Sequence, residues 1–401
     1  MKLGQNPLNG VRVTQVSSAG QPPTTRHVWL DALRGIGATA VLLEHMTYRF
    51  LPDLRPAWFN LGIYGVLVFF LVSGYIIPAS LERGGDVRAF WISRIFRLYP
   101  LYILTIFVVL LAAPIQPLRA NTDPVSHVTM LMEVTGSWAL IEPMWTLSYE
   151  MVFYLLVTAL FVAGVHRRSG LFAVSFALLS VLAAFVMPAR GLLGGPIVPL
   201  VVLVVVLAGL GCVLFGPRTA RTAGAILLGV LAITLVAVGS RVPWQGAMIL
   251  AVMFTGTVVH RWERGQGSGL WPILGVTFLI CLTPFMKPMT INGPANLMTV
   301  VLAGGTFAIF MALRDRRLPY PLAWLGLISY SVYMLHIPLL RLFLFAFGEP
   351  RRFPEIVQLG LGLAAIAAIF GVSWLTYRFV ELPTQRLGRR LAGRRLAGLR
   401  S

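Results

Sequence analysis

Apolar runs of roughly 20 residues follow one another along almost the whole chain of 401 residues. An α-helix needs that length to cross the hydrocarbon core of a bilayer, where it satisfies its own backbone hydrogen bonds. Hydrophobic residues make up 57% of the chain and charged residues only 12%. A soluble protein carries about twice that charged fraction. The sequence therefore predicts an all-α fold, a polytopic bundle of transmembrane helices.

The pattern predicts about twelve spans, or ten if one pair of short segments within 222–260 is re-entrant. A polar leader over 1–28 is predicted to be disordered and not to be a cleavable signal, and a basic tail is predicted over 384–401. The transmembrane domain covers 29–383 between them. Its spans are predicted at 29–50, 61–81, 98–114, 144–164, 170–187, 192–215, 222–238, 244–260, 270–285, 294–313, 324–346 and 357–379.

The distribution of basic residues predicts how the bundle is oriented. The chain has 33 Lys and Arg against 14 Asp and Glu, a net charge of +19. One set of alternate loops, with both termini, holds most of the basic residues. The other set has only eight: Arg49, Arg55, Arg119, Arg190, Arg241, Lys287, Arg351 and Arg352. Positively charged loops stay cytoplasmic, so both termini are predicted to be cytoplasmic.

The dispersal of this charge also bears on partners. Arginines spread over many short loops do not form the single patch that binds nucleic acid. The run Arg386–Arg400 has apolar residues between its arginines, and we expect it to contact anionic membrane lipid. Cys212 and Cys281 lie in separate apolar spans without metal-ligand spacing, so we expect them to pack as small hydrophobes and expect no metal site.

Arg34 and His45 are two polar residues in the first span, 45 − 34 = 11 positions apart. Eleven steps of a helix end within about 20° of the starting direction, so both side chains lie on one face, roughly 16 Å apart along the axis. Ionisable residues are costly to insert in a membrane and usually mark a pathway or a reaction. The alternative is that the arginine and the histidine reach for the two interfaces.

A basic, aromatic stretch over 90–100 precedes the third span, and its Arg94 and Arg97 share a helical face. These arginines either contact lipid as a basic collar or hold a phosphorylated cytosolic donor. In the second span, Ser73-Gly74-Tyr75 has the small residues that permit close helix approach, and we expect a structural role there.

Two further blocks carry polar side chains into apolar spans. Trp145-Thr146-Leu147-Ser148-Tyr149-Glu150 begins the fourth span, and an inward direction would place Glu150 in the outer half of the bilayer, at a depth similar to His45. The eleventh span contains Tyr330 and places His336 near mid-depth. A carboxylate and two imidazoles at similar depths indicate a shared interior site, although such residues also serve as hydrogen-bonding contacts between helices.

Together these motifs resemble the integral-membrane, type 3 acyltransferases, which acylate carbohydrates of the cell envelope and some secondary metabolites. The resemblance extends from Leu30 to the Val380-Glu381-Leu382-Pro383 that closes the last span. It rests on the Arg-ten-residues-His spacing, the Trp-x-Leu-Ser-x-Glu-x-x-Phe-Tyr block and the Ser-Tyr-Ser-x-Tyr-x-x-His-x-Pro block in one order. No single motif would be specific. Many members have two acidic residues where this chain has Glu150-Met151.

The resemblance implies that Arg34 and His45 are the essential pair, that Arg94 and Arg97 form the basic loop motif and that Glu150 is the acidic residue. The phosphates of acyl-CoA, by resemblance acetyl-CoA, are then expected on Arg94, Arg97 and also Arg34. His45 is the candidate general base on the acceptor hydroxyl, with Glu150 orienting the imidazole. Supporting roles are assigned to Trp145, Ser148, Tyr330 and His336. Ser148 could carry the acyl group, but helix packing is the favoured explanation for this residue.

The expected function is O-acylation of exopolysaccharide or another envelope glycan, or of a glycosylated metabolite, at the bacterial plasma membrane. Because the chain ends shortly after its last span, we expect no appended hydrolase-like domain. The competing class is a secondary transporter or flippase, since twelve spans with intramembrane Arg, His and Glu suit a proton-coupled exporter. No repeat relates the two halves of the chain, which favours the enzyme.

Overall fold

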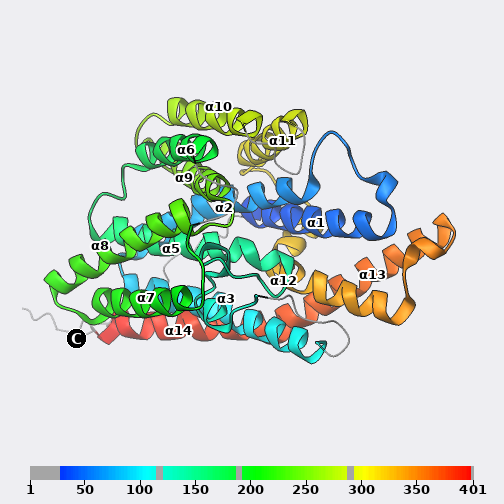
Figure 1. The fold of residues 1–401 in the computed structure, drawn as a ribbon. Helices are drawn as coiled ribbons and strands as arrows, with labels where there is room; N and C mark the ends of the chain where they lie inside the picture. Colours follow the sequence, from blue (N-terminus) through cyan, green and yellow to red (C-terminus); the bar gives the residue numbers. More distant parts are fainter. Residues whose placement is uncertain (1–27, 114–120, 187–191, 287–292, 399–401) are drawn as a thin grey trace, which may run out of the picture.

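The computed structural model describes residues 28–113, 121–186, 192–286 and 293–398, and these residues form helices without a strand (Figure 1). All of the predicted leader except Val28 lies outside the described residues. Each of the twelve predicted spans overlaps a helix, although α3 begins at Val87 and so includes the basic stretch predicted to precede the third span. These helices are α1 (Val28–Phe50), α2 (Leu61–Gly84), α3 (Val87–Leu111), α5 (Trp145–Val162), α6 (Ser169–Val186), α7 (Ile197–Phe215), α8 (Arg218–Thr234), α9 (Pro243–Glu263), α10 (Leu270–Met286), α11 (Gly293–Ala312), α12 (Tyr320–Phe347) and α13 (Glu355–Thr376).

The predicted fold class is confirmed. By length and composition, eight helices in the described ranges are able to cross a membrane, and α10 and α11 contribute shorter apolar stretches. Helices α7, α8 and α13 expose large apolar side chains on their outer faces, as a lipid-facing surface requires. The side of the membrane on which the termini lie stays a prediction.

Helix α9 lies at the centre of the bundle and is buried along nearly its whole length, packed against α2 and α6. Figure 1 shows α6 and α10 at one edge of the molecule and α14 (Leu382–Gly398) at the opposite edge, beside α3. The predicted basic tail therefore begins as a helix, and its Gly388 lies close against Phe96 of α3. Its contact with lipid stays a prediction.

Glycine brings α2 and α9 into backbone contact. A Cβ atom added to Gly74 would lie 1.7 Å from the carbonyl oxygen of Met253, and one added to Gly256 would lie 2.2 Å from that of Leu71. The Thr257 hydroxyl donates to the Gly74 carbonyl at 2.8 Å. The structural role expected for Ser73-Gly74-Tyr75 is thus supported by the geometry of the crossing.

We expect Gly74→Ala to destabilise the protein, because the new methyl group meets backbone that cannot move without separating the helices. Overpacking of this kind costs about 1–3 kcal/mol. Thermal unfolding in detergent measures the loss. Gly84→Ala is the matched control, since nothing lies within 4 Å of a Cβ at the end of the same helix. Equal melting temperatures for the two variants would contradict the assignment.

The connection between α3 and α5 folds into the bundle. Its described part contains α4 (Pro124–Thr129) and the 3-10 turns η2 (Met132–Val134) and η3 (Glu142–Met144). Met130, Leu131 and Ile141 are fully buried there. Helix α5 consequently begins below the surface of the bundle, and this start fixes the depth of the carboxylates that follow.

Candidate active site

Helix α1 is continuous from Val28 to Phe50 and packs along α12. Arg34 lines a pocket at one level of this interface, and His45, three turns later, contacts His336 of α12. The ring centroids of the two histidines are 5.1 Å apart. The predicted common face of Arg34 and His45 is therefore confirmed, and it is the face that meets α12.

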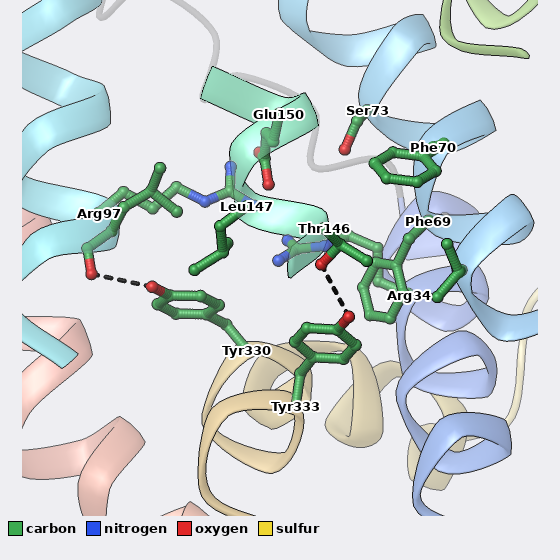
Figure 2. Close-up of a pocket in the computed structure, with 12 residues that line it drawn as sticks. Arg34, Phe69, Phe70, Ser73, Arg97, Thr146, Leu147, Glu150, Tyr330 and Tyr333 are labelled. Atoms are coloured by element: carbon green, nitrogen blue, oxygen red, sulfur yellow. Dashed lines mark hydrogen bonds between the residues drawn. The ribbon is translucent and has the colours of Figure 1, made fainter. Parts of the chain in front are cut away.

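The pocket lies between α1, α2, α3, α5 and α12 (Figure 2). Arg34, Arg97 and Glu150 enter it from three different helices, and Figure 2 shows Glu150 and the end of the Arg97 side chain directed into the same space. Arg34 lies within electrostatic range of both Arg97 and Glu150. The remaining lining residues are Val66, Phe69, Phe70, Ser73, Leu98, Thr146, Leu147, Tyr330 and Tyr333.

Two tyrosines of α12 line the pocket, and one of them also contacts a histidine. The Tyr330 hydroxyl donates to the Leu98 carbonyl at 2.9 Å, which ties α12 to α3 beside Arg97. The Tyr333 hydroxyl bonds Thr146 at 2.7 Å, and its ring is 6.1 Å from that of His336. Tyr330 thus has a structural hydrogen bond and a place in the pocket, and Tyr333 joins the two ends of the site.

The two arginines of the basic stretch differ in their surroundings. Arg97 lines the pocket, whereas Arg94 is buried and donates to the Ser80 hydroxyl at 2.6 Å. The Arg94 guanidinium also lies 5.5 Å from the ring centre of Tyr154. Tyr154 in turn donates to Glu150 at 2.5 Å. Arg94 therefore packs outside the pocket, against Ser80 and Tyr154, whereas the Arg97 side chain lines the pocket.

His45 lies at the other end of the site. Its Nδ1 is 2.9 Å from the Val41 carbonyl, so we assign the proton to Nδ1 and the lone pair to Nε2. Nε2 faces the Glu142 carboxylate at 3.4 Å, and about a quarter of the His45 side chain is exposed. His336 is fully buried, with Nδ1 on the Val332 carbonyl at 3.0 Å and no hydrogen-bond partner on Nε2.

The sequence interpretation expects Glu150 beside His45, and the structure does not bring these two side chains together. The carboxylate beside His45 belongs to Glu142, and Glu150 bonds Tyr154 at the level of Arg34 and Arg97. The two glutamates are 150 − 142 = 8 residues apart, about 12 Å along a helix. Because α5 begins inside the bundle, Glu150 lies deeper than a span starting at the membrane surface would place it. Glu142 lies at the level of His45, where Glu150 was expected.

Ser148 and Trp145 have packing environments. Ser148 is fully buried, and its hydroxyl accepts from the Glu133 backbone N–H at 3.1 Å. The Trp145 ring packs edge-on against Tyr149, with centroids 5.9 Å apart. These contacts favour the packing interpretation of Ser148, because its hydroxyl joins α5 to the buried connection.

Burial of the neighbouring Glu133 side chain predicts a pH dependence. Burial raises the pKa of Glu133 from 4.5 to about 7, against the opposing effect of Arg241 at 3.5 Å. The folded protein therefore holds this proton more tightly than the unfolded chain, and stability falls as the pH rises from about 4.5 to 7. Over this interval the free energy of unfolding falls by about 3 kcal/mol in total. We expect Glu133→Gln to flatten the melting temperature across this interval; an unchanged slope would contradict the assignment.

Two carboxylates of the site have no assigned role in the sequence interpretation. Glu142 directly precedes Pro143 and gives no local sign of its contact with His45. Glu381 is buried in a π-helical turn, η6 (Tyr377–Glu381), accepts from the Ser331 hydroxyl and lies within electrostatic range of Arg34 and Arg97. The one sequence signal for Glu381 is its place in the Val380-Glu381-Leu382-Pro383 motif. No cluster of metal-ligating residues occurs among the described residues.

Residues 27–378 match the family of acyltransferase domains. The chain belongs to this acyltransferase family. The resemblance to the type 3 acyltransferases is confirmed: the chain contains an acyltransferase domain, and eight helices in its described ranges are long and apolar enough to cross a membrane. This assignment favours an enzyme over the transporter or flippase. No solved structure matches the chain.

Three curated relatives illustrate the family. The peptidoglycan O-acetyltransferase OatA of Listeria monocytogenes is 24% identical over 90% of this chain and 56% of its own length. The putative peptidoglycan O-acetyltransferase YrhL of Bacillus subtilis is 31% identical over 36% of this chain and 25% of its own. The acyltransferase MdmB of Streptomyces mycarofaciens is 29% identical over 33% of this chain and 39% of its own. The chain thus spans at most about half the length of these relatives.

Proposed function

We propose that this protein transfers an acetyl group from acetyl-CoA to a hydroxyl group of an envelope glycan, such as exopolysaccharide or peptidoglycan, at the plasma membrane. The observation that carries the proposal is the position of His45 within an acyltransferase domain. Its side chain is partly exposed at the surface of the protein, and its Nε2 faces the Glu142 carboxylate. Two relatives are named as peptidoglycan O-acetyltransferases, which supports a glycan acceptor.

In the proposed reaction the acceptor hydroxyl gives its proton to Nε2 of His45 while its oxygen attacks the thioester carbonyl. The new C–O bond forms as the C–S bond breaks, and the CoA thiolate takes the proton from the imidazolium. Glu142, 3.4 Å from Nε2, stabilises the positive charge on the ring, and the Val41 carbonyl holds the tautomer. Glu142 thus supplies the carboxylate that the sequence interpretation assigned to Glu150, and it acts on the charged ring.

We place the donor phosphates at the Arg34–Arg97 end of the site. Arg34 and Arg97 line one pocket, and their guanidinium groups are suited to bind phosphates through charge-assisted hydrogen bonds. The distance of roughly 16 Å between Arg34 and His45 along α1 suits a donor whose phosphates and thioester are separated by a long flexible arm. Arg94 supports Arg97 through the Ser80 and Tyr154 contacts.

The test uses purified protein in lipid nanodiscs, incubated with acetyl-CoA and with envelope glycan fractions, including peptidoglycan fragments and exopolysaccharide. We expect CoA release that depends on the glycan, and an alkali-labile acetyl ester on the glycan by mass spectrometry. His45→Ala protein at equal amounts is the control. Glycan-dependent CoA release that is equal in the two proteins would contradict the role of His45, and acetylation without CoA release would contradict the donor.

The orientation follows from the charge distribution and has its own test. The loop between α11 and α12 carries Arg314, Arg316 and Arg317, and with the C-terminal segment it is expected in the cytoplasm. Reporter fusions within this loop and at Ser401 should both report a cytoplasmic location. An external signal from either fusion would reverse the side from which the donor enters.

A further inference from the structure

Tyr48 lies one turn beyond His45 on α1 and has three arginines around its exposed ring. The guanidinium carbons of Arg49, Arg55 and Arg351 are 5.7, 5.9 and 5.9 Å from the ring centre. Arg351 also donates to the Tyr48 carbonyl at 2.6 Å, which fixes the connection between α12 and α13 against the end of α1. We call these four residues the Tyr48 cluster.

The charge of this cluster is unusual for its position. It lies at the His45 end of α1, on the side of the bundle where alternate loops carry only eight basic residues, and three of those eight belong to it. Arg55 pairs with the largely buried Glu44. Among the described residues, Arg49 and Arg351 have no carboxylate at ion-pair distance. Like charges held together without counterions repel one another and attract an anion.

The exposure of the cluster makes it accessible to a large ligand. About half of the Tyr48 side chain and about two-fifths of Arg55 are exposed, and the Glu142 carboxylate beside His45 is about half exposed. A helix C-terminus attracts one or two cations, which accounts for Arg49 and for the Arg351 cap. Arg55 comes from the loop after η1 (Pro52–Leu54), and its guanidinium group, paired with Glu44, lies beside the same ring.

We propose that the Tyr48 cluster binds an acidic saccharide of the acceptor glycan, one that carries a carboxylate. This inference rests on the proposed function, whose acceptor class it specifies. Arginine binds a carboxylate through two parallel hydrogen bonds, and the flat face of a tyrosine ring packs against the apolar face of a sugar. A sugar held at Tyr48 lies one helical turn, about 5 Å, from His45, so the hydroxyl of an adjacent sugar reaches the base.

The binding test uses the full chain with an oligogalacturonate and its carboxyl-reduced, neutral counterpart as probes, in nanodiscs of uncharged phosphatidylcholine. We expect the acidic probe to bind at least about tenfold more tightly than the neutral one, and this preference to weaken as salt rises. Arg351→Gln and Arg55→Gln should each reduce binding of the acidic probe by about tenfold. Arg352→Gln is the matched control, because Arg352 is an exposed arginine next to Arg351 and is not one of the three arginines around the Tyr48 ring.

The possible results separate this inference from the proposed function. His45→Ala should bind the acidic probe normally, because binding precedes the chemistry. Binding of the acidic probe that depends on Arg351 and Arg55 supports the inference even if no acetyl transfer occurs. Acetyl transfer to a glycan with equal affinities for both probes, or losses in Arg352→Gln as large as those in Arg351→Gln, would overturn the inference and leave the function standing.

A lipid ligand is the remaining alternative. If the cluster binds anionic phospholipid, neutral nanodiscs should show no acidic-probe binding, and phosphatidylglycerol should protect wild-type protein, but not Arg351→Gln, against thermal unfolding. That combination would also overturn the assignment to a saccharide.

Discussion

Replacing His45 with alanine is expected to lower acetyl transfer by a factor of roughly 10²–10⁴, because the variant has no group at this position to take the hydroxyl proton. Insertion and folding should be retained, since His45 is partly exposed and its one backbone bond lies within its own helix. The measurement is turnover with saturating acetyl-CoA, at equal amounts of folded protein by size-exclusion chromatography. Turnover near that of the wild type would show that His45 is only an interfacial residue.

The same experiment distinguishes the two glutamates. If Glu142 acts through His45, Glu142→Gln should lower turnover, and the double variant His45→Ala/Glu142→Gln should be little worse than His45→Ala alone. Glu150→Gln is the comparison, because Glu150 belongs to the arginine pocket. Its loss combined with that of His45 should be closer to multiplicative. A multiplicative result for Glu142 and a non-additive one for Glu150 would restore the pairing expected from the sequence.

Replacing Arg97 with alanine is expected to raise the Michaelis constant for acetyl-CoA by about 10- to 100-fold, the equivalent of one lost hydrogen bond to a charged group. The turnover number at saturating donor should change much less, because Arg97 lines the pocket at the Arg34 end of the site. Isothermal titration with CoA, which has the phosphates without the thioester, measures the same loss directly. Unchanged CoA affinity would show that the pocket does not hold the phosphates.

Arg94→Ala provides the contrast. Arg94 is buried against Ser80, Phe90 and Tyr154, so its removal leaves a cavity and an unpaired hydroxyl group. We expect a lower melting temperature with a smaller rise in the Michaelis constant than Arg97→Ala gives. An Arg94 variant of normal stability with a large rise in the Michaelis constant would place the donor on both arginines, as the shared helical face alone suggests.

The sequence by itself determined the helices and the faces they bury. A hydrophobic run of membrane length has one way to satisfy its backbone, so all twelve predicted spans became helices. The spacing of Arg34 and His45 likewise fixed their common face, because that depends only on helical periodicity. The association of α1, α5 and α12 around the site follows from their polar residues, which are costly in lipid and stable only against one another.

Tertiary structure decided which of these polar residues meet. The partner of a side chain on another helix depends on the axial offset between the two helices, and that offset is set by how the connections fold. Here the buried connection over 124–144 starts α5 inside the bundle, which brings Glu142 to His45 and Glu150 to Arg34 and Arg97. The Tyr48 cluster has the same origin: Arg55 and Arg351 are about 300 residues apart in sequence, and only the packing of α1 against α12 brings them to one ring.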